Sequence, residues 1–141
     1  MYRLNLTTAA FVLALGLAGC ATTDTVGARF SNGVLTDPAG MTLYTFDKDV
    51  ENSGKSVCNG PCATNWPPLA ARNEDKPSGL WSTVTRDDGS RQLAYKGKPV
   101  YRWIKDQKPG DQTGDGVANA WRIVKQDVQT TAVRERTSNA Y

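Results

Sequence analysis

The chain carries the same segment twice, and this duplication constrains its fold more than any other feature. Residues 40–49, GMTLYTFDKD, align with residues 97–106, GKPVYRWIKD. Each copy is preceded by a turn that contains Asn-Gly or Asp-Gly, at Ser31-Asn32-Gly33 and at Asp87-Asp88-Gly89. One repeat of short strands could hardly bury its apolar face alone, so the two copies are expected to pack on each other.

The spacing of turn signals predicts strands and no long helix. Short apolar runs such as Val34-Leu35-Thr36 and Gln92-Leu93-Ala94-Tyr95 lie between turn residues, and no sustained 3.6-residue periodicity is present. Asn-Gly and Asp-Gly favour hairpins because these residues tolerate positive φ. The predicted fold is all-β: a small sandwich or barrel-like domain built from two pseudosymmetric repeats of short antiparallel strands.

The first twenty residues predict export and a lipid anchor. Arg3 precedes an apolar run from Ala9 to Leu17, which ends in Leu17-Ala18-Gly19-Cys20. The run is too short to span a bilayer but has the form of a signal-peptide core. Its last four residues resemble the lipobox of bacterial lipoproteins, in which the cysteine is acylated and becomes the mature N-terminus. An ordinary secretory signal is the alternative.

These features divide the chain into four expected parts. Residues 1–19 are a lipoprotein signal peptide, 20–27 a tether, 28–126 the two-repeat domain and 127–141 a polar tail. The repeats span about 28–69 and 82–125. The expected location is the bacterial cell envelope, with the protein attached to the membrane through lipid on Cys20. Ala21 after the cysteine favours the outer membrane if the host is Gram-negative.

Composition excludes several kinds of chemistry. The 141 residues include no histidine, which excludes Ser-His and Cys-His catalytic pairs and His-ligated metals. The formal net charge is +3, and the charges are interspersed without a basic block, so nucleic acid is not expected as a partner. No cofactor is expected.

Two cysteines remain after Cys20, and they are predicted to form a disulfide. Beyond the inner membrane the environment is oxidising, and Gly60-Pro61 forms a turn that can bring Cys58 and Cys62 to bonding distance. A redox role for this pair is the alternative, although catalytic pairs usually have two intervening residues at a helix N-terminus.

The repeated motif resembles a known family. Tyr-x-Phe/Trp-x-x-Asp occurs twice, with CNGPCATNWPPL between the copies. This pattern is similar to a family of bacterial secreted repeats, often predicted lipoproteins, with a Y-x4-D motif and no determined function. The resemblance covers residues 33–124, and the motif residues are Tyr44, Phe46, Asp49, Tyr101, Trp103 and Asp106, with Trp66 and Trp121 closing the repeats.

Several interpretations of the motif residues remain open. Tyr44 and Phe46 share one strand face, as do Tyr101 and Trp103; such aromatic pairs either pack in the core or form a platform for a sugar ring. Asp49 and Asp106 follow the strand ends, where aspartate commonly accepts backbone hydrogen bonds in Asx-type turns. The alternatives are a carboxylate pair for glycoside hydrolysis and a ligand or metal site.

A loop in the second repeat is a weak candidate for a cation site. Asp111 and Asp115 lie four residues apart in a Gly-rich segment, but no glutamate follows at the spacing of an EF-hand. The favoured interpretation is therefore a Gly/Asp turn, with no metal.

The function predicted from these features is that of a non-enzymatic, lipid-anchored envelope protein that binds a partner or has a structural role. One alternative is a module that binds carbohydrate or peptidoglycan through exposed aromatic side chains, drawn from Tyr44, Trp66, Tyr101, Trp103 and Trp121. The other is a redox accessory that acts through Cys58 and Cys62. An envelope protein or a glycan is the expected partner.

Overall fold

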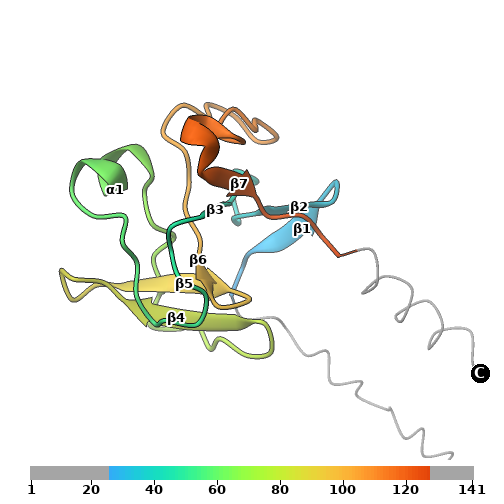
Figure 1. The fold of residues 1–141 in the computed structure, drawn as a ribbon. Helices are drawn as coiled ribbons and strands as arrows, with labels where there is room; N and C mark the ends of the chain where they lie inside the picture. Colours follow the sequence, from blue (N-terminus) through green and yellow to red (C-terminus); the bar gives the residue numbers. More distant parts are fainter. Residues whose placement is uncertain (1–25, 128–141) are drawn as a thin grey trace, which may run out of the picture.

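The computed structural model describes residues 26–127 and consists mostly of short strands and loops (Figure 1). The signal peptide, Cys20 and positions 128–141 of the predicted tail lie outside the described residues. The elements follow in the order β1 (Arg29–Ser31), β2 (Val34–Thr36), β3 (Tyr44–Phe46), α1 (Pro61–Asn65), β4 (Trp81–Thr85), β5 (Arg91–Tyr95), β6 (Lys98–Pro99), the 3₁₀ turn η1 (Val117–Asn119) and β7 (Trp121–Ile123).

The strands form three small antiparallel sheets, β1–β2, β3–β7 and β4–β5–β6. The predicted all-β class and antiparallel pairing are confirmed. A sandwich or barrel shape is not, because no sheet in the described part of the chain closes on itself. Within residues 26–127, no helix is long and apolar enough to cross a membrane.

Two tight hairpin turns follow directly from the sequence. Asn32 and Gly33 have φ of 50° and 78°, and Lys96 and Gly97 have φ of 50° and 77°. Paired positive φ angles are those of a two-residue turn whose twist matches the flanking strands. The Asn-Gly and Lys-Gly positions therefore set the registers of β1–β2 and β5–β6.

Each repeat gives its last segment to the other half of the molecule. β7, from the end of the second repeat, pairs with β3 of the first, and the Leu35 N–H donates to the Val124 carbonyl at 2.9 Å. In the matching position of the second repeat, the Leu93 N–H donates to the Leu69 carbonyl of the first at 2.8 Å. This exchange buries both repeats together, as the duplication predicted.

The alternation of residues along the two motif strands separates two cores. Leu43 and Val100 lie in an aliphatic cluster with Leu35, Leu69, Leu93 and Val26. The neighbouring Tyr44 and Tyr101 face the other way, into a second core with Trp66, Trp121 and Cys58. Val26, inside the predicted tether, is 5% exposed, so the packed domain extends to this residue.

The short helix α1 was not expected from periodicity. Pro61 stands in its first turn, where a missing N–H costs nothing, and Gly60 before it has φ of 54°. Cys62 lies in this five-residue helix, and Trp66 follows its last residue. The Trp66 N–H donates to the Cys62 carbonyl at 2.8 Å.

Candidate functional site

The two motif tyrosines lie side by side where the repeats meet. Tyr44 and Tyr101 form an antiparallel bridge in which each backbone N–H donates to the other residue's carbonyl at 2.9 Å. Both residues are 0% exposed. Because equivalent residues of two repeats pair with each other, a local two-fold axis passes between them.

Each tyrosine binds the aspartate of the other repeat. The Tyr44 hydroxyl donates to Asp106 Oδ2 at 2.6 Å, and the Tyr101 hydroxyl donates to Asp49 Oδ2 at 2.5 Å. The carboxylates are themselves 8% and 2% exposed. Hydrogen bonds to a charged acceptor in such surroundings are stronger than bonds between neutral groups. The motif therefore holds the repeats together through two crossed Tyr–Asp pairs.

The second oxygen of each carboxylate holds the loop that follows it. Asp49 Oδ1 accepts from the Val57 N–H at 2.7 Å, and Asp106 Oδ1 accepts from Thr113 through its N–H at 3.0 Å and its hydroxyl at 2.7 Å. Sequence reasoning expected these carboxylates to accept from nearby N–H groups at the strand ends. In the structure they reach seven or eight residues along the chain.

The aromatic side chains form a column with the same symmetry. Trp66 and Trp121 stack with 3.7 Å between ring centroids and 4° between planes. Trp103 stacks on the outer face of Trp66 at 3.9 Å, and Phe46 stacks on Trp121 at 4.4 Å. Tyr44 meets Trp66 edge-on at 5.4 Å, and Tyr101 meets Trp121 edge-on at 5.1 Å. We call these six residues the aromatic cluster.

Burial of the tyrosines perturbs their titration. Burial, together with the hydrogen bond to the opposite aspartate, raises the pKa of both hydroxyls well above the ordinary value. Both effects favour the neutral phenol, which acts as a donor to the carboxylate.

The cysteines are bonded as predicted, and a buried arginine holds the loop that carries them. Cys58 and Cys62 form a disulfide with Cα atoms 5.2 Å apart. Arg86, 6% exposed, donates to the Cys58 carbonyl, to Asn59 Oδ1 at 3.2 Å and to Ser56 Oγ at 3.0 Å. Its fourth partner is Gln92 Oε1 at 2.7 Å.

Arg86, Ser56 and Gln92 were not identified from the sequence. Ser56 Oγ also contacts the Tyr101 hydroxyl at 2.6 Å, so the arginine connects to the Tyr101–Asp49 pair through this one serine. The sequence does contain a signal for Gln92. This polar residue occupies the position in β5 that matches the apolar Val34 in β2. It is 0% exposed, and its Nε2 donates to the Val100 carbonyl at 2.8 Å.

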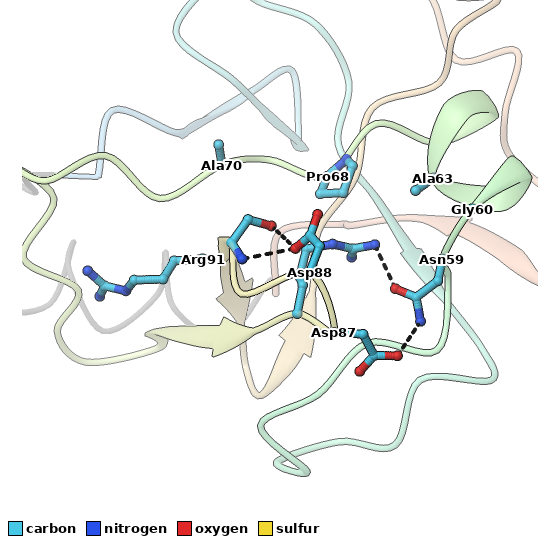
Figure 2. A pocket seen from close by; sticks show the side chains of 10 residues that line it. Asn59, Gly60, Ala63, Pro68, Ala70, Asp87, Asp88 and Arg91 are labelled. Atoms are coloured by element: carbon cyan, nitrogen blue, oxygen red, sulfur yellow. Dashed lines mark hydrogen bonds between the residues drawn. The ribbon is translucent and has the colours of Figure 1, made fainter.

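A cleft of about 390 Å³ lies between the disulfide loop and the β4–β5 hairpin. The residues that line it are Asn59, Gly60, Ala63, Pro68, Ala70, Arg86, Asp87, Asp88, Ser90 and Arg91. Figure 2 shows Asn59 joined to Asp87 across the cleft, while the Arg91 side chain points away from them. Repeat 1 contributes one wall and repeat 2 the other.

The remaining aspartate candidates hold turns. Asp111 Oδ2 accepts from the Gln107 and Lys108 N–H groups at 2.9 and 3.1 Å, and Asp115 Oδ1 accepts from the Ile123 N–H at 3.0 Å. Within the described range, no group of three or more His, Cys, Asp or Glu side chains is arranged to hold a metal ion.

Comparison with known proteins identifies the repeats. A family model described as a secreted repeat of unknown function matches residues 30–70 and again residues 82–125. Neither a curated protein nor a solved structure matches the chain. The two matches coincide with the two copies that the structure joins through the crossed Tyr–Asp pairs.

Proposed function

The chain belongs to this family of secreted repeats, and on that premise we propose a lipid-anchored protein of the bacterial cell envelope whose β domain is a non-enzymatic binding module. The anchor is Cys20, and the outer membrane is the favoured location in a Gram-negative host. The binding surface is the cleft between the disulfide loop and the β4–β5 hairpin.

The crossed Tyr–Asp pairs carry the non-enzymatic part of this proposal. Both oxygens of Asp49 and of Asp106 accept hydrogen bonds from the protein itself, and both tyrosine hydroxyls are engaged. An acid/base pair needs carboxylates that can reach substrate. The most distinctive residues of the sequence are instead used to build the domain.

The cleft is favoured as the binding surface because it lies where the two repeats differ. The disulfide loop belongs to repeat 1 alone, and the hairpin that carries Arg86 is longer than the tight Asn32-Gly33 hairpin of repeat 1. The two additions bond to each other and enclose the cleft. Small residues in its lining, among them Gly60, Ala63 and Ala70, leave space, while Asp87 and Ser90 supply polar groups.

The alternatives receive less support from the geometry. A sugar platform needs several exposed rings, but four of the five candidates, Tyr44, Trp66, Tyr101 and Trp121, are at most 4% exposed, and the fifth, Trp103, is half-buried. A thiol-exchange site needs an accessible sulfur, but Cys58 is 0% exposed, and Cys62 is half-buried against the aromatic side chains. Glycan fragments are therefore expected to leave tryptophan fluorescence unchanged.

The anchor is tested by the variant Cys20→Ser, which removes the acylation site. Two acyl chains hold a protein firmly at a membrane, so the variant is expected in the soluble fraction with an unchanged melting temperature. The matched control is Cys58→Ala with Cys62→Ala, which keeps Cys20 and should stay with the membrane. Equal membrane attachment of Cys20→Ser and wild type would contradict the anchor.

The cleft is tested by site-specific photo-crosslinking in the native envelope. A photoreactive residue at the exposed Ala70, in the cleft, is expected to capture one defined partner. The same residue at the exposed Lys76, in the segment between the repeats, is the control. Capture of the same partner at both positions, or at neither, would contradict binding in the cleft.

A further inference from the structure

We propose that the aromatic cluster is a one-electron relay, which carries an oxidising equivalent from Trp103 near the surface to the buried Tyr–Asp pairs. The substrates are small one-electron oxidants of the envelope, such as organic peroxyl or carbonate radicals. This activity does not depend on the cleft or on the anchor.

The column provides a continuous path inward. Trp103 is half-buried, whereas Trp66 and Trp121 are 4% and 3% exposed, so an oxidant in solution meets Trp103 first. The ring centroids are 3.9 Å apart from Trp103 to Trp66 and 3.7 Å from Trp66 to Trp121. An indole ring can lose one electron to a strong one-electron oxidant, and two parallel indoles in contact share the resulting positive hole.

The tyrosines are placed to receive that hole. Tyr44 touches Trp66 with its ring edge, and Tyr101 does the same to Trp121. Oxidation of a phenol releases its proton, and each hydroxyl already donates to a carboxylate oxygen, at 2.6 and 2.5 Å. The proton therefore moves along an existing hydrogen bond as the electron leaves, and no water has to enter the core.

In the Tyr44 branch, one electron and one proton leave the phenol. The oxidant removes one electron from Trp103 and becomes its reduced anion, and an electron from Tyr44 refills Trp103 through Trp66. The Tyr44 O–H bond breaks, and its proton forms an O–H bond with Asp106 Oδ2. The products are a neutral tyrosyl radical, a protonated Asp106 and the reduced oxidant. A one-electron reductant such as ascorbate reverses the last transfer.

The sulfur atoms beside the column do not intercept the hole. Cys58 is buried among the tyrosines and tryptophans of the aromatic cluster, and Cys62 packs against them. The two cysteines are bonded to each other. The relay therefore has no thiolate at its inner end, and the tyrosines are its final electron donors.

The relay is tested in a full chain, disulfide intact, in which the three tyrosines outside the cluster, Tyr2, Tyr95 and Tyr141, are replaced by Phe. The purified protein is photo-oxidised with photogenerated ruthenium(III) tris-bipyridine, and radicals are identified by freeze-quench electron paramagnetic resonance. This background, in which all further variants are made, is expected to show a tyrosyl radical. Trp103→Phe keeps an aromatic ring but removes the indole, and is expected to lose most of that signal.

Matched variants keep the test decisive. Trp81 is also half-buried and lies 5.1 Å from Tyr95, outside the cluster, so Trp81→Phe should leave the signal unchanged. Tyr44→Phe with Tyr101→Phe should replace the tyrosyl signal by a tryptophanyl one. Equal losses in Trp103→Phe and Trp81→Phe, or no loss in Trp103→Phe, would overturn the relay.

Discussion

Two loops correspond to each other in the two repeats, but different contacts hold them. One follows β3 in the first repeat, and the other precedes β7 in the second. Both begin at a motif aspartate, and both return a tryptophan to the central stack. The first is closed by the disulfide and by Arg86 from the other repeat. The second has neither, and instead Gly114 packs against Tyr44 and Trp66 while its N–H donates to the Tyr44 hydroxyl at 3.2 Å.

This difference separates what the duplicated fold requires from what each copy has added. The crossed Tyr–Asp pairs, the Trp66–Trp121 stack and the exchanged strands obey the two-fold relation. The means of closing the loops do not. Symmetric features should therefore give equal effects in both repeats on substitution, and asymmetric features should give effects in one repeat only.

The largest expected effect comes from the central tryptophans. Trp66→Ala and Trp121→Ala each remove a buried ring from the middle of the stack, and truncation of a buried tryptophan costs about 3–5 kcal/mol. The two losses should be similar in urea unfolding. If the two losses in unfolding free energy differ by more than the smaller of them, the two tryptophans are not equivalent, and the two-fold relation does not hold for the stack.

A smaller effect is expected at Gly114, in one repeat only. A Cβ at this position would stand 2.8 Å from Trp66 and 2.9 Å from Tyr44, so Gly114→Ala overpacks the core. Overpacking typically costs about 1–3 kcal/mol. Val57 in the first loop is 57% exposed, and the control variant Val57→Ala should leave the melting temperature nearly unchanged. Equal effects at the two positions would show that the loops pack alike.

Loss of the disulfide should affect the first loop alone. Opening so short a covalent loop removes roughly 2 kcal/mol on the chain-entropy model. Cys58→Ala with Cys62→Ala should speed amide hydrogen exchange around Val57, while exchange at Thr113 in the second loop follows only global unfolding. Faster exchange in both loops would mean that the disulfide supports the whole interface.

Alkaline pH should weaken the interface through the tyrosines. Their pKa values are raised in the folded protein, so the stability they contribute is fully present below the unfolded pKa of about 10 and is lost as pH rises beyond it. Urea midpoints should fall with alkaline pH in wild type. Tyr44→Phe with Tyr101→Phe should lessen that fall, whereas unchanged pH dependence would assign it to other groups.

The sequence predicted the local parts of this structure better than the contacts between its halves. Asn32-Gly33 and the Tyr-x-Phe spacing act within a few residues, so the hairpin and the two-sided strand could be predicted. The Tyr44–Asp106 bond joins residues 62 apart, and nothing in either repeat says which copy supplies the partner. Each repeat contains its own motif tyrosine and its own motif aspartate. The pattern is therefore equally compatible with pairing within a repeat and with pairing between repeats.

The asymmetric parts were harder to predict. Arg86 resembles any polar residue at a hairpin end, and only the three-dimensional meeting of that hairpin with the Cys58 loop buries it. Helix α1 has five residues, too few to show a 3.6-residue period. The cleft depends on both features and could not be located from the sequence.

The most direct test of the crossed interface is a pair of double-mutant cycles. Tyr44→Phe is combined with Asp106→Asn, its partner in the other repeat, and separately with Asp49→Asn, the aspartate of its own repeat. Hydrogen-bonded partners couple by about 0.5–3 kcal/mol, whereas independent sites add to within about 0.3–0.5 kcal/mol. Strong coupling is expected between Tyr44 and Asp106, and weaker coupling between Tyr44 and Asp49. Stronger coupling of Tyr44 to Asp49 would contradict pairing between the repeats.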